Sequence, residues 1–128
     1  SILLDTENIR KALTLLERKK EKKFVITITK YKHPLERALT YEKKIVKPIF
    51  PKKIKERTQD LKVYYHDAGQ FYFARAKELL KEKKMILTNS KPIILENSEA
   101  QDIDTYDDWS IAELKYSKLL NEKDNTVC

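Results

Sequence analysis

The feature that most constrains the fold is a run of apolar and β-branched residues, FVITIT, at positions 24–29. A strand with one solvent-facing side alternates apolar and polar residues, but this run has little polar interruption. It therefore predicts a strand that is buried on both faces. Residues 6–22 precede it and predict a helix, whose apolar side chains at helical spacing are Ile9, Ala12, Leu13 and Leu16. A helix followed by a buried strand is typical of an α/β sheet.

Residues 30–66 interrupt this pattern. They contain Pro34, Pro48 and Pro51, and their apolar residues alternate poorly. Proline cannot donate to a strand ladder, so within sheets it is confined to edges, first positions and bulges. We therefore expect an irregular excursion with short strands near 35–46, lying outside the main sheet.

The regular pattern returns after the excursion. QFYFA at 70–74 and KPIIL at 91–95 predict strands, and RAKELLKEK at 75–83 predicts a helix between them. We expect this helix to turn three apolar side chains inward: Ala76, Leu79 and Leu80.

Capping residues mark the starts of two helices. Asp5 or Thr6 can cap the first helix, and Thr105 can form a capping box with Asp108 at the start of a last helix. Residues 121–128 are polar, and we expect them to fray. The expected inward stripe of the last helix is Trp109, Ala112, Tyr116, Leu119 and Leu120.

Composition excludes several classes of protein. The 128 residues suffice for one domain with a sizeable core, and no apolar run approaches the roughly 20 residues of a membrane helix. The one cysteine, Cys128, rules out a disulfide framework, so we expect a cytoplasmic protein. The one glycine, Gly69, leaves no glycine-rich phosphate loop. Because the chain opens at Ser1 on an apolar stretch that leads directly into a helix, we expect it to begin within a fold.

The net charge of +7 is compatible with nucleic-acid binding. Most of the positive charge is lysine, in runs such as RKKEKK at 18–23 and KEKK at 81–84 that also contain glutamate. Mixed runs of this kind are typical of a solvated face. No zinc-finger spacing or RNA-binding aromatic motif accompanies them, so we expect no nucleic-acid partner.

Two aspartates stand immediately before the last helix, in QDIDT at 101–105. If the segment is extended, Asp102 and Asp104 point to one side and Ile103 to the other, with the two Cα atoms roughly 6.5–7 Å apart. Two carboxylates so placed can converge on one hard cation, and magnesium is usually held by one or two carboxylates together with substrate phosphates. The alternative is a pair of solvated acids near a helix N-terminus, where negative charge is favoured in any case.

Other polar residues lie in ERTQDL at 56–61 and around the glycine. On an extended segment Arg57 and Gln59 would share a face, and arginine can grip a carboxylate or phosphate with two hydrogen bonds. The alternative for both residues is a surface turn. His66 is a candidate base or a structural histidine, and the adjacent Asp67 is able to fix its tautomer.

Three of these motifs occur together and in order: RTQD at 57–60, HDAGQFY at 66–72 and QDIDT at 101–105. In combination they resemble the CMP-sialate synthetase (acylneuraminate cytidylyltransferase) family, which activates nine-carbon acidic sugars with CTP. The resemblance runs from about residue 2 to residue 120. It implies the C-terminal portion of a Rossmann-like three-layer nucleotidyltransferase fold. It also implies that Asp102 and Asp104 are the catalytic magnesium ligands.

The resemblance further implies a sugar pocket along residues 68–72. Glycine at position 69 suits either a close backbone approach to the ligand or a positive φ. Phe71 and Tyr72 would be apolar walls of this pocket, and the polar residues that would read the sugar are Arg57, Gln59, His66 and Gln70.

Two positions indicate which sugar is bound. Sialate members usually carry arginine where this chain has Thr58, and asparagine where it has Ala68. Both departures match the pseudaminate branch of the family, so we expect pseudaminic acid rather than N-acetylneuraminic acid.

The family's excursion implies a homodimer that forms through residues 30–66. The implied reaction is attack of the sugar's anomeric hydroxyl on the α-phosphate of CTP, with release of pyrophosphate. Because this chain has no phosphate loop, we expect it to be inactive alone. The alternative is a truncated or split fragment of such an enzyme that only folds or dimerises.

Overall fold

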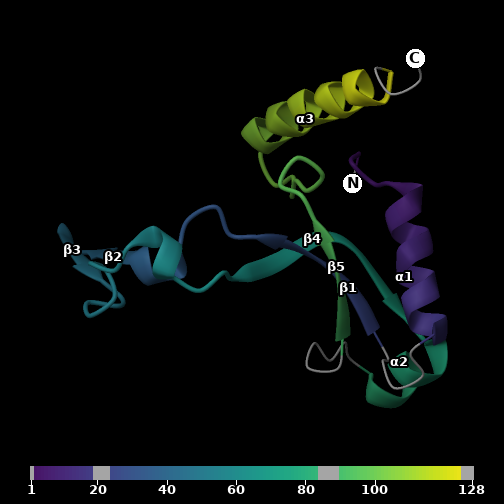
Figure 1. Ribbon diagram of the computed structural model, residues 1–128, viewed down its shortest axis with the longest axis horizontal. Helices are drawn as coiled ribbons and strands as arrows, with labels where there is room; N and C mark the ends of the chain where they lie inside the picture. Colours follow the sequence, from purple (N-terminus) through teal and green to yellow (C-terminus); the bar gives the residue numbers. More distant parts are fainter. Residues whose placement is uncertain (1, 19–23, 84–89, 125–128) are drawn as a thin grey trace. The chain divides into compact units, whose positions relative to one another are not determined.

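The computed structural model describes residues 2–18, 24–83 and 90–124 (Figure 1). Its secondary structure is mixed α/β, as expected from the sequence. The chain divides into two compact units. Ser1–Thr29 and Asp67–Cys128 form the first unit, and Lys30–His66, the segment that interrupts the α/β pattern, form the second. Among the described helices, none has the length and hydropathy needed to cross a membrane.

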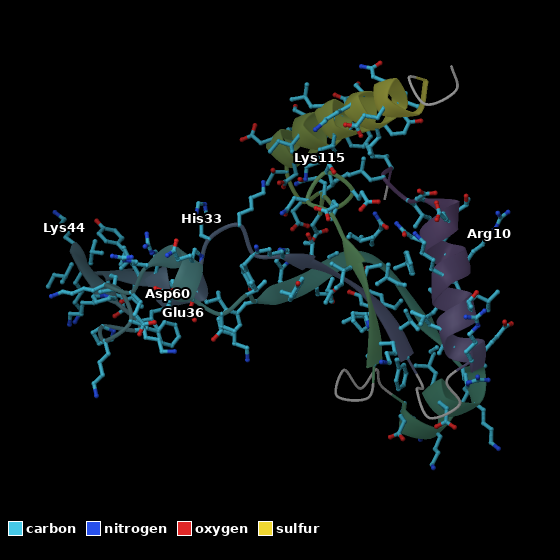
Figure 2. The ribbon with its side chains drawn as sticks, in the orientation of Figure 1. Arg10, His33, Glu36, Lys44, Asp60 and Lys115 are labelled. Atoms are coloured by element: carbon cyan, nitrogen blue, oxygen red, sulfur yellow. The ribbon has the colours of Figure 1, made fainter. Side chains whose placement is uncertain are left out.

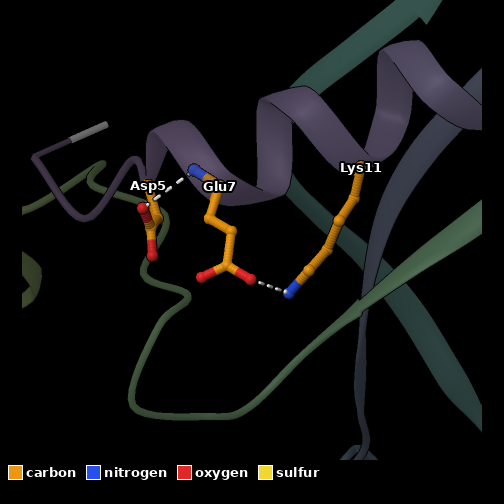
Figure 3. A network of polar contacts seen from close by, with 3 residues as sticks. All are labelled: Asp5, Glu7 and Lys11. Carbon is orange, nitrogen blue, oxygen red and sulfur yellow. Dashed lines mark hydrogen bonds and ion pairs between the residues drawn. The ribbon is translucent and has the colours of Figure 1, made fainter.

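Helix α1 spans Thr6–Arg18, and residues 19–22 of the expected helix lie outside the described residues. Asp5 caps it, because the Asp5 Oδ1 atom accepts a hydrogen bond from the Glu7 N–H at 3.0 Å (Figure 3). Glu7 also forms an ion pair with Lys11 one turn later, at 3.1 Å. Both partners of this pair are exposed, so it adds little to stability.

The buried face of α1 differs from the expected one. Its buried residues are Asn8, Ala12 and Leu16, whereas Leu13 is 48% exposed. Ala12 is fully buried and belongs with Leu16 to the core cluster, whereas Leu13 lies outside it. The apolar spacing therefore identified the helix and two of its buried residues, Ala12 and Leu16, but missed Asn8 and wrongly placed Leu13 inward.

Three strands form the main sheet in the order β4-β1-β5: Tyr65–Ala74, Phe24–Lys30 and Ser90–Leu95. β1 and β5 are parallel, with Phe24 opposite Ser90 at one end and Thr29 opposite Leu95 at the other. Strand β5 is one residue longer than expected, whereas β4 starts five residues earlier than expected.

Strand β4 runs against β1, so the sheet is mixed. The Tyr31 N–H, just after β1, donates to the Tyr64 carbonyl, just before β4, at 3.0 Å, whereas Thr27 contacts Phe71 further along β4. At this second point the Thr27 hydroxyl contacts the backbone of β4. It accepts from the Phe71 N–H at 3.3 Å and donates to the Phe71 carbonyl at 3.2 Å.

The core of the first unit lies between α1 and the sheet. Phe24, Val25 and Thr27 of β1 are completely buried, which confirms that this strand is covered on both faces. Two aromatic side chains of β4, Phe71 and Phe73, pack against the core cluster and against each other edge to face at 5.6 Å. The buried members of the cluster are Ala12, Leu16, Val25, Ala68, Ile93, Leu95 and Ala100.

The other two helices are less buried than expected. Helix α2, Ala76–Glu82, has no buried residue, and Leu80 is 76% exposed. Helix α3, Tyr106–Asp124, buries only Ala112 completely within the described residues, while Trp109 and Tyr116 remain nearly half exposed. Ala112 is therefore buried as expected, whereas the inward stripe expected for α2 and the burial expected for Trp109 and Tyr116 are wrong. Residues 121–124, expected to fray, continue α3.

The second unit is built around a hairpin of two exposed strands, β2 (Leu39–Glu42) and β3 (Ile45–Pro48). They pair antiparallel, from Leu39 opposite Pro48 to Glu42 opposite Ile45, in a sheet separate from the main one. Their turn has positive φ angles of 50° and 64° at Lys43 and Lys44. Two short 3-10 turns, Leu35–Arg37 and Thr58–Asp60, complete the unit.

Candidate active site

Two of the sequence motifs meet at Gly69. This residue lies inside β4 with φ +62°, the second of the two alternatives given above for a glycine at this position. A Cβ atom built on Gly69 would lie 3.8 Å from the carboxylate of Asp102. Since 3.8 Å is an ordinary contact distance, the backbone conformation rather than crowding explains the glycine. The carboxylate of Asp102 thus lies directly over the glycine of HDAGQFY.

Tyr72 and Asp67 form a close pair on the same strand. The Tyr72 hydroxyl donates to Asp67 Oδ2 at 2.6 Å, and Asp67 Oδ1 accepts from the Gly69 N–H at 2.9 Å. Residues five apart on a regular strand point to opposite faces, so the irregularity at Gly69 brings them to one side. The hydrogen bond to Asp67 raises the pKa of Tyr72 to about 12, assisted by partial burial and by the charges of Asp67 and Asp102.

The loop that carries Asp102 and Asp104 alternates in exposure, as expected, although it is not a strand. Both aspartates are exposed and Ile103 between them is half-buried. Asp102 Oδ1 accepts from the Ile103 N–H at 3.2 Å. Within the described residues the Asp104 carboxylate accepts no hydrogen bond, so its oxygens are open to a cation. Two solvent-facing carboxylates form a donor set that fits a hard cation such as magnesium.

Asp102 and Asp104 are the two acids of the segment 101–105. In the described part of the chain, no group of three or more His, Cys, Asp or Glu side chains gathers as a metal site. A surface pocket adjoins Asp104 and is lined by Ile103, Asp104, Thr105, Tyr106 and Trp109.

Asp108 anchors this loop to α3. Its Oδ2 accepts from the Thr105 hydroxyl at 2.7 Å, the Thr105 N–H at 3.0 Å and the Asp104 N–H at 3.3 Å. The Asp108 N–H donates to the Thr105 Oγ1 at 3.2 Å, which completes the expected capping box. These bonds, above all that from the Thr105 hydroxyl, lower the pKa of Asp108.

Gln101 and Lys115 extend the anchor. The Gln101 side-chain amide donates to Asp108 Oδ1 at 3.2 Å and to the Asp102 carbonyl at 3.0 Å. Lys115 extends from α3 (Figure 2) and donates to Gln101 Oε1 at 2.8 Å and to the Ala100 carbonyl. The backbone around Asp102 is thereby tied to the helix that follows it.

Gln70 supports the same loop from the sheet. Its side-chain NH₂ donates to the Glu99 carbonyl at 2.7 Å and to the Leu3 carbonyl at 3.3 Å. Both of its N–H groups are therefore engaged with backbone. Phe71, next on β4, packs against the core, whereas Tyr72 is exposed. The roles of these three residues toward a sugar stay predictions.

Arg57, Gln59 and His66 belong to the second unit. Arg57 and Gln59 are exposed, but their segment is not extended, because Gln59 lies in the 3-10 turn closed by the Asp60 N–H and the Arg57 carbonyl at 3.0 Å. The premise that both share one strand face is wrong, and the surface-turn alternative describes the backbone. The His66 ring lies against Tyr31 with centroids 4.7 Å apart.

Comparison with known proteins identifies relatives over most of this chain. It is 34% identical over 97 residues to proteins named pseudaminic acid cytidylyltransferase from Campylobacter jejuni subsp. jejuni serotypes O:2 and O:23/36. This chain is a homologue of the pseudaminic acid cytidylyltransferases. The segment that matches is 75% of this chain and 42% of each relative. The resemblance to this group of enzymes, expected from the three motifs, is confirmed.

A longer relative of the same kind occurs in Helicobacter pylori. It is named pseudaminic acid cytidylyltransferase and UDP-2,4-diacetamido-2,4,6-trideoxy-beta-L-altropyranose hydrolase. This chain is 30% identical to it over 103 residues, which are 80% of this chain and 20% of the relative. The chain therefore spans less than half the length of these cytidylyltransferases. No family model matches the chain.

Sequence reasoning about this cytidylyltransferase homologue missed the contact of Asp67 with Tyr72. One signal was present, since an aspartate two residues before a glycine is typical of an Asx turn, in which the side chain accepts from the backbone two residues on. The contact with Tyr72 carried no comparable signal, because it depends on the irregular backbone at Gly69.

Proposed function

We propose that this chain is the sugar- and metal-binding part of a CTP-dependent cytidylyltransferase that activates pseudaminic acid. The parent enzyme would convert CTP and the sugar to a CMP-sugar and pyrophosphate. The observation that carries the proposal is the position of the Asp102 carboxylate over Gly69, because it joins the motif proposed for metal binding to the motif proposed for sugar binding. The names of the relatives support the reaction class.

The proposal includes a fold and an assembly. Residues 1–128 would form the C-terminal portion of a Rossmann-like three-layer nucleotidyltransferase domain. Residues 30–66 would be its dimerisation excursion, in a cytoplasmic homodimer. The exposed apolar side chains of the β2-β3 hairpin support this role, because an isolated two-stranded hairpin is marginally stable in water and gains from a partner surface.

Asp102 and Asp104 would hold magnesium. When bound, the ion would offset the negative charge of the triphosphate, which is the main demand of this chemistry. The Asp108 anchor would fix the loop that presents the two carboxylates, since a mobile pair would lose the geometry on which positioning depends.

The residues of β4 would position the sugar. Tyr72 is the exposed aromatic side chain beside Asp102, and its ring would flank the sugar or its acyl substituents. With the sugar so placed, its anomeric hydroxyl would attack the α-phosphate of CTP, the bond from the α-phosphate to the pyrophosphate would break, and the hydroxyl proton would be released.

A chimera tests the function. This chain would replace the matching segment of the Campylobacter jejuni relative, and pyrophosphate release would be measured with CTP and either pseudaminic acid or N-acetylneuraminic acid. We expect kcat/KM to be about tenfold or more higher for pseudaminic acid, the discrimination that a few pocket contacts supply. The reverse preference would move the chain to the sialate branch, and a folded chimera without turnover would count against the function.

A further inference from the structure

Asp67 uses its two carboxylate oxygens for two different tasks. Oδ1 accepts from the Gly69 N–H at 2.9 Å and holds the irregular backbone, while Oδ2 accepts from the Tyr72 hydroxyl at 2.6 Å. The second distance is in the range of a charge-assisted O–H···O⁻ bond. One exposed side chain thus connects the glycine with the aromatic residue beyond it.

This bond fixes what Tyr72 can offer to a ligand. A tyrosine hydroxyl has one proton to donate and lone pairs with which to accept. Because the proton is committed to Asp67, the phenol oxygen faces a ligand as an acceptor. Tyr72 is 46% exposed, so the side chain is accessible.

The groups that surround Tyr72 are also negatively charged. Asp102 lies over Gly69 and its negative charge acts on Tyr72. On β4 itself, the Asp67 carboxylate and the phenol oxygen of Tyr72 are both acceptors. Such a surface favours N–H and O–H donors and disfavours another carboxylate.

We propose that Asp67 is a positioning residue for the sugar, which makes Tyr72 an acceptor for an N–H or O–H group of the substrate. The inference rests on the proposed function. It also sets the orientation of the acidic sugar, whose acylamino or hydroxyl side faces Tyr72 and whose own carboxylate points away from this acceptor surface.

The single glycine provides a direct probe. When the 128-residue chain is labelled with ¹⁵N-glycine, it gives a single amide signal, that of Gly69. We expect Asp67→Asn to shift this signal strongly, because the substitution alters the acceptor of the Gly69 N–H. Tyr72→Phe should shift it less, and Asp107→Asn, on the exposed first turn of α3, should leave it in place. An unchanged signal in Asp67→Asn would overturn the positioning role.

Titration with pseudaminic acid tests whether Tyr72 accepts a hydrogen bond from the sugar. Following the same signal, we expect Asp67→Asn and Tyr72→Phe each to weaken sugar binding by about tenfold, the effect of one lost hydrogen bond. The double variant should be little weaker than either single variant, because the two residues act as a unit. Additive losses, or a loss with Asp67→Asn alone, would contradict the proposal.

Kinetics separate this inference from the proposed function. In the chimera, Asp67→Asn should raise KM for the sugar by about tenfold and leave KM for CTP and kcat within a few-fold. A fall in kcat at unchanged sugar KM would place Asp67 in another role. If the parent chimera neither binds the sugar nor releases pyrophosphate, the proposed function fails and the acceptor role toward the sugar fails with it. The Gly69 signal still decides separately whether Asp67 holds the backbone.

Discussion

A single half-buried carboxylate, that of Asp108, holds the loop that carries both candidate metal ligands. It accepts two backbone N–H groups, one hydroxyl and one side-chain amide from residues 101–105. Hydrogen bonds to the ionised form stabilise that form, which is why the pKa of Asp108 is lowered. The ionised state of Asp108 and the order of this loop are therefore linked.

The linkage predicts an acid-sensitive loop. Because the folded-state pKa of Asp108 lies below its ordinary value, its contribution to stability is present above pH 3.8 and is lost as the pH falls through the lowered pKa. We expect the amides of residues 104 and 105 to lose hydrogen-exchange protection below this pH. Asp108→Asn should lose protection at neutral pH with little further change in acid. An acid response of the same size in that variant would assign the effect to another group.

Asp104 provides the second prediction at this scale. In the chimera, Asp104→Asn should lower kcat by on the order of a hundredfold, since a neutral amide neither attracts magnesium nor offsets charge as a carboxylate does. Its circular dichroism spectrum and melting temperature should stay unchanged, because the Asp104 carboxylate has no hydrogen bond to lose among the described residues. Asp107→Asn is the matched control, and equal activity of both variants would remove Asp104 from the metal site.

The residue contacts were the hardest feature to derive from the sequence. The pattern QDIDT predicted the exposed pair and the capping box, because both are local. It gave no sign that Gln70 would hold the carbonyls of Leu3 and Glu99, which are 67 and 29 residues away. Contacts over such separations depend on how strands and loops assemble, and one sequence does not encode them as a pattern.

Among the elements, the β2-β3 hairpin exposes both of its strands and several large apolar side chains that a partner surface would bury. All eight of its strand residues are exposed, with Tyr41 at 71%. Its Lys43-Lys44 turn also adopts positive φ values, which residues other than glycine, asparagine and aspartate disfavour. The large apolar side chains that it exposes are Leu39, Tyr41, Ile45 and Val46.

Burial of this hairpin in a homodimer predicts a concentration-dependent association. We expect light scattering to show a dimer at micromolar concentrations. Replacing the cross-strand pair Tyr41 and Val46 with lysine should give a monomer, since charges desolvated at an interface are costly. Leu80→Lys, a similar change on the exposed face of α2, should leave the association unchanged. A wild-type chain that stays monomeric at high micromolar concentration would contradict the assembly.

The positions of helices and strands could be predicted from the sequence better than the sides of the helices that are buried. The run FVITIT and the caps at Asp5 and Thr105 identified β1, α1 and α3, because periodicity and capping are local properties. The inward sides of α2 and α3 could not be obtained in this way. An apolar stripe indicates which side of a helix prefers burial, but what covers that side depends on the rest of the assembly.

For the molecule as a whole, we predict that the 128-residue chain does not bind a triphosphate by itself, because its single glycine leaves no glycine-rich loop. A triphosphate carries about four negative charges, and binding it requires fixed donors or cations rather than mobile surface lysines. We expect calorimetry with CTP and magnesium to show no micromolar binding by the isolated chain, and no pyrophosphate release. Micromolar binding with turnover would show that a phosphate site lies within these residues.

The two ends of the second unit lie next to each other. The chain enters this unit at Lys30 and leaves it at His66, and the Tyr31–Tyr64 hydrogen bond holds the two crossings side by side. A segment whose entry and exit are adjacent can be exchanged as a cassette without resetting the register of the flanking strands. In the proposed homodimer, recombination among relatives at these two points would exchange the β2-β3 hairpin together with Thr58, one of the two positions that indicate the sugar, while the aspartate loop keeps its sequence. The evolutionary histories of subunit pairing and of substrate choice would then be linked through one exchanged segment.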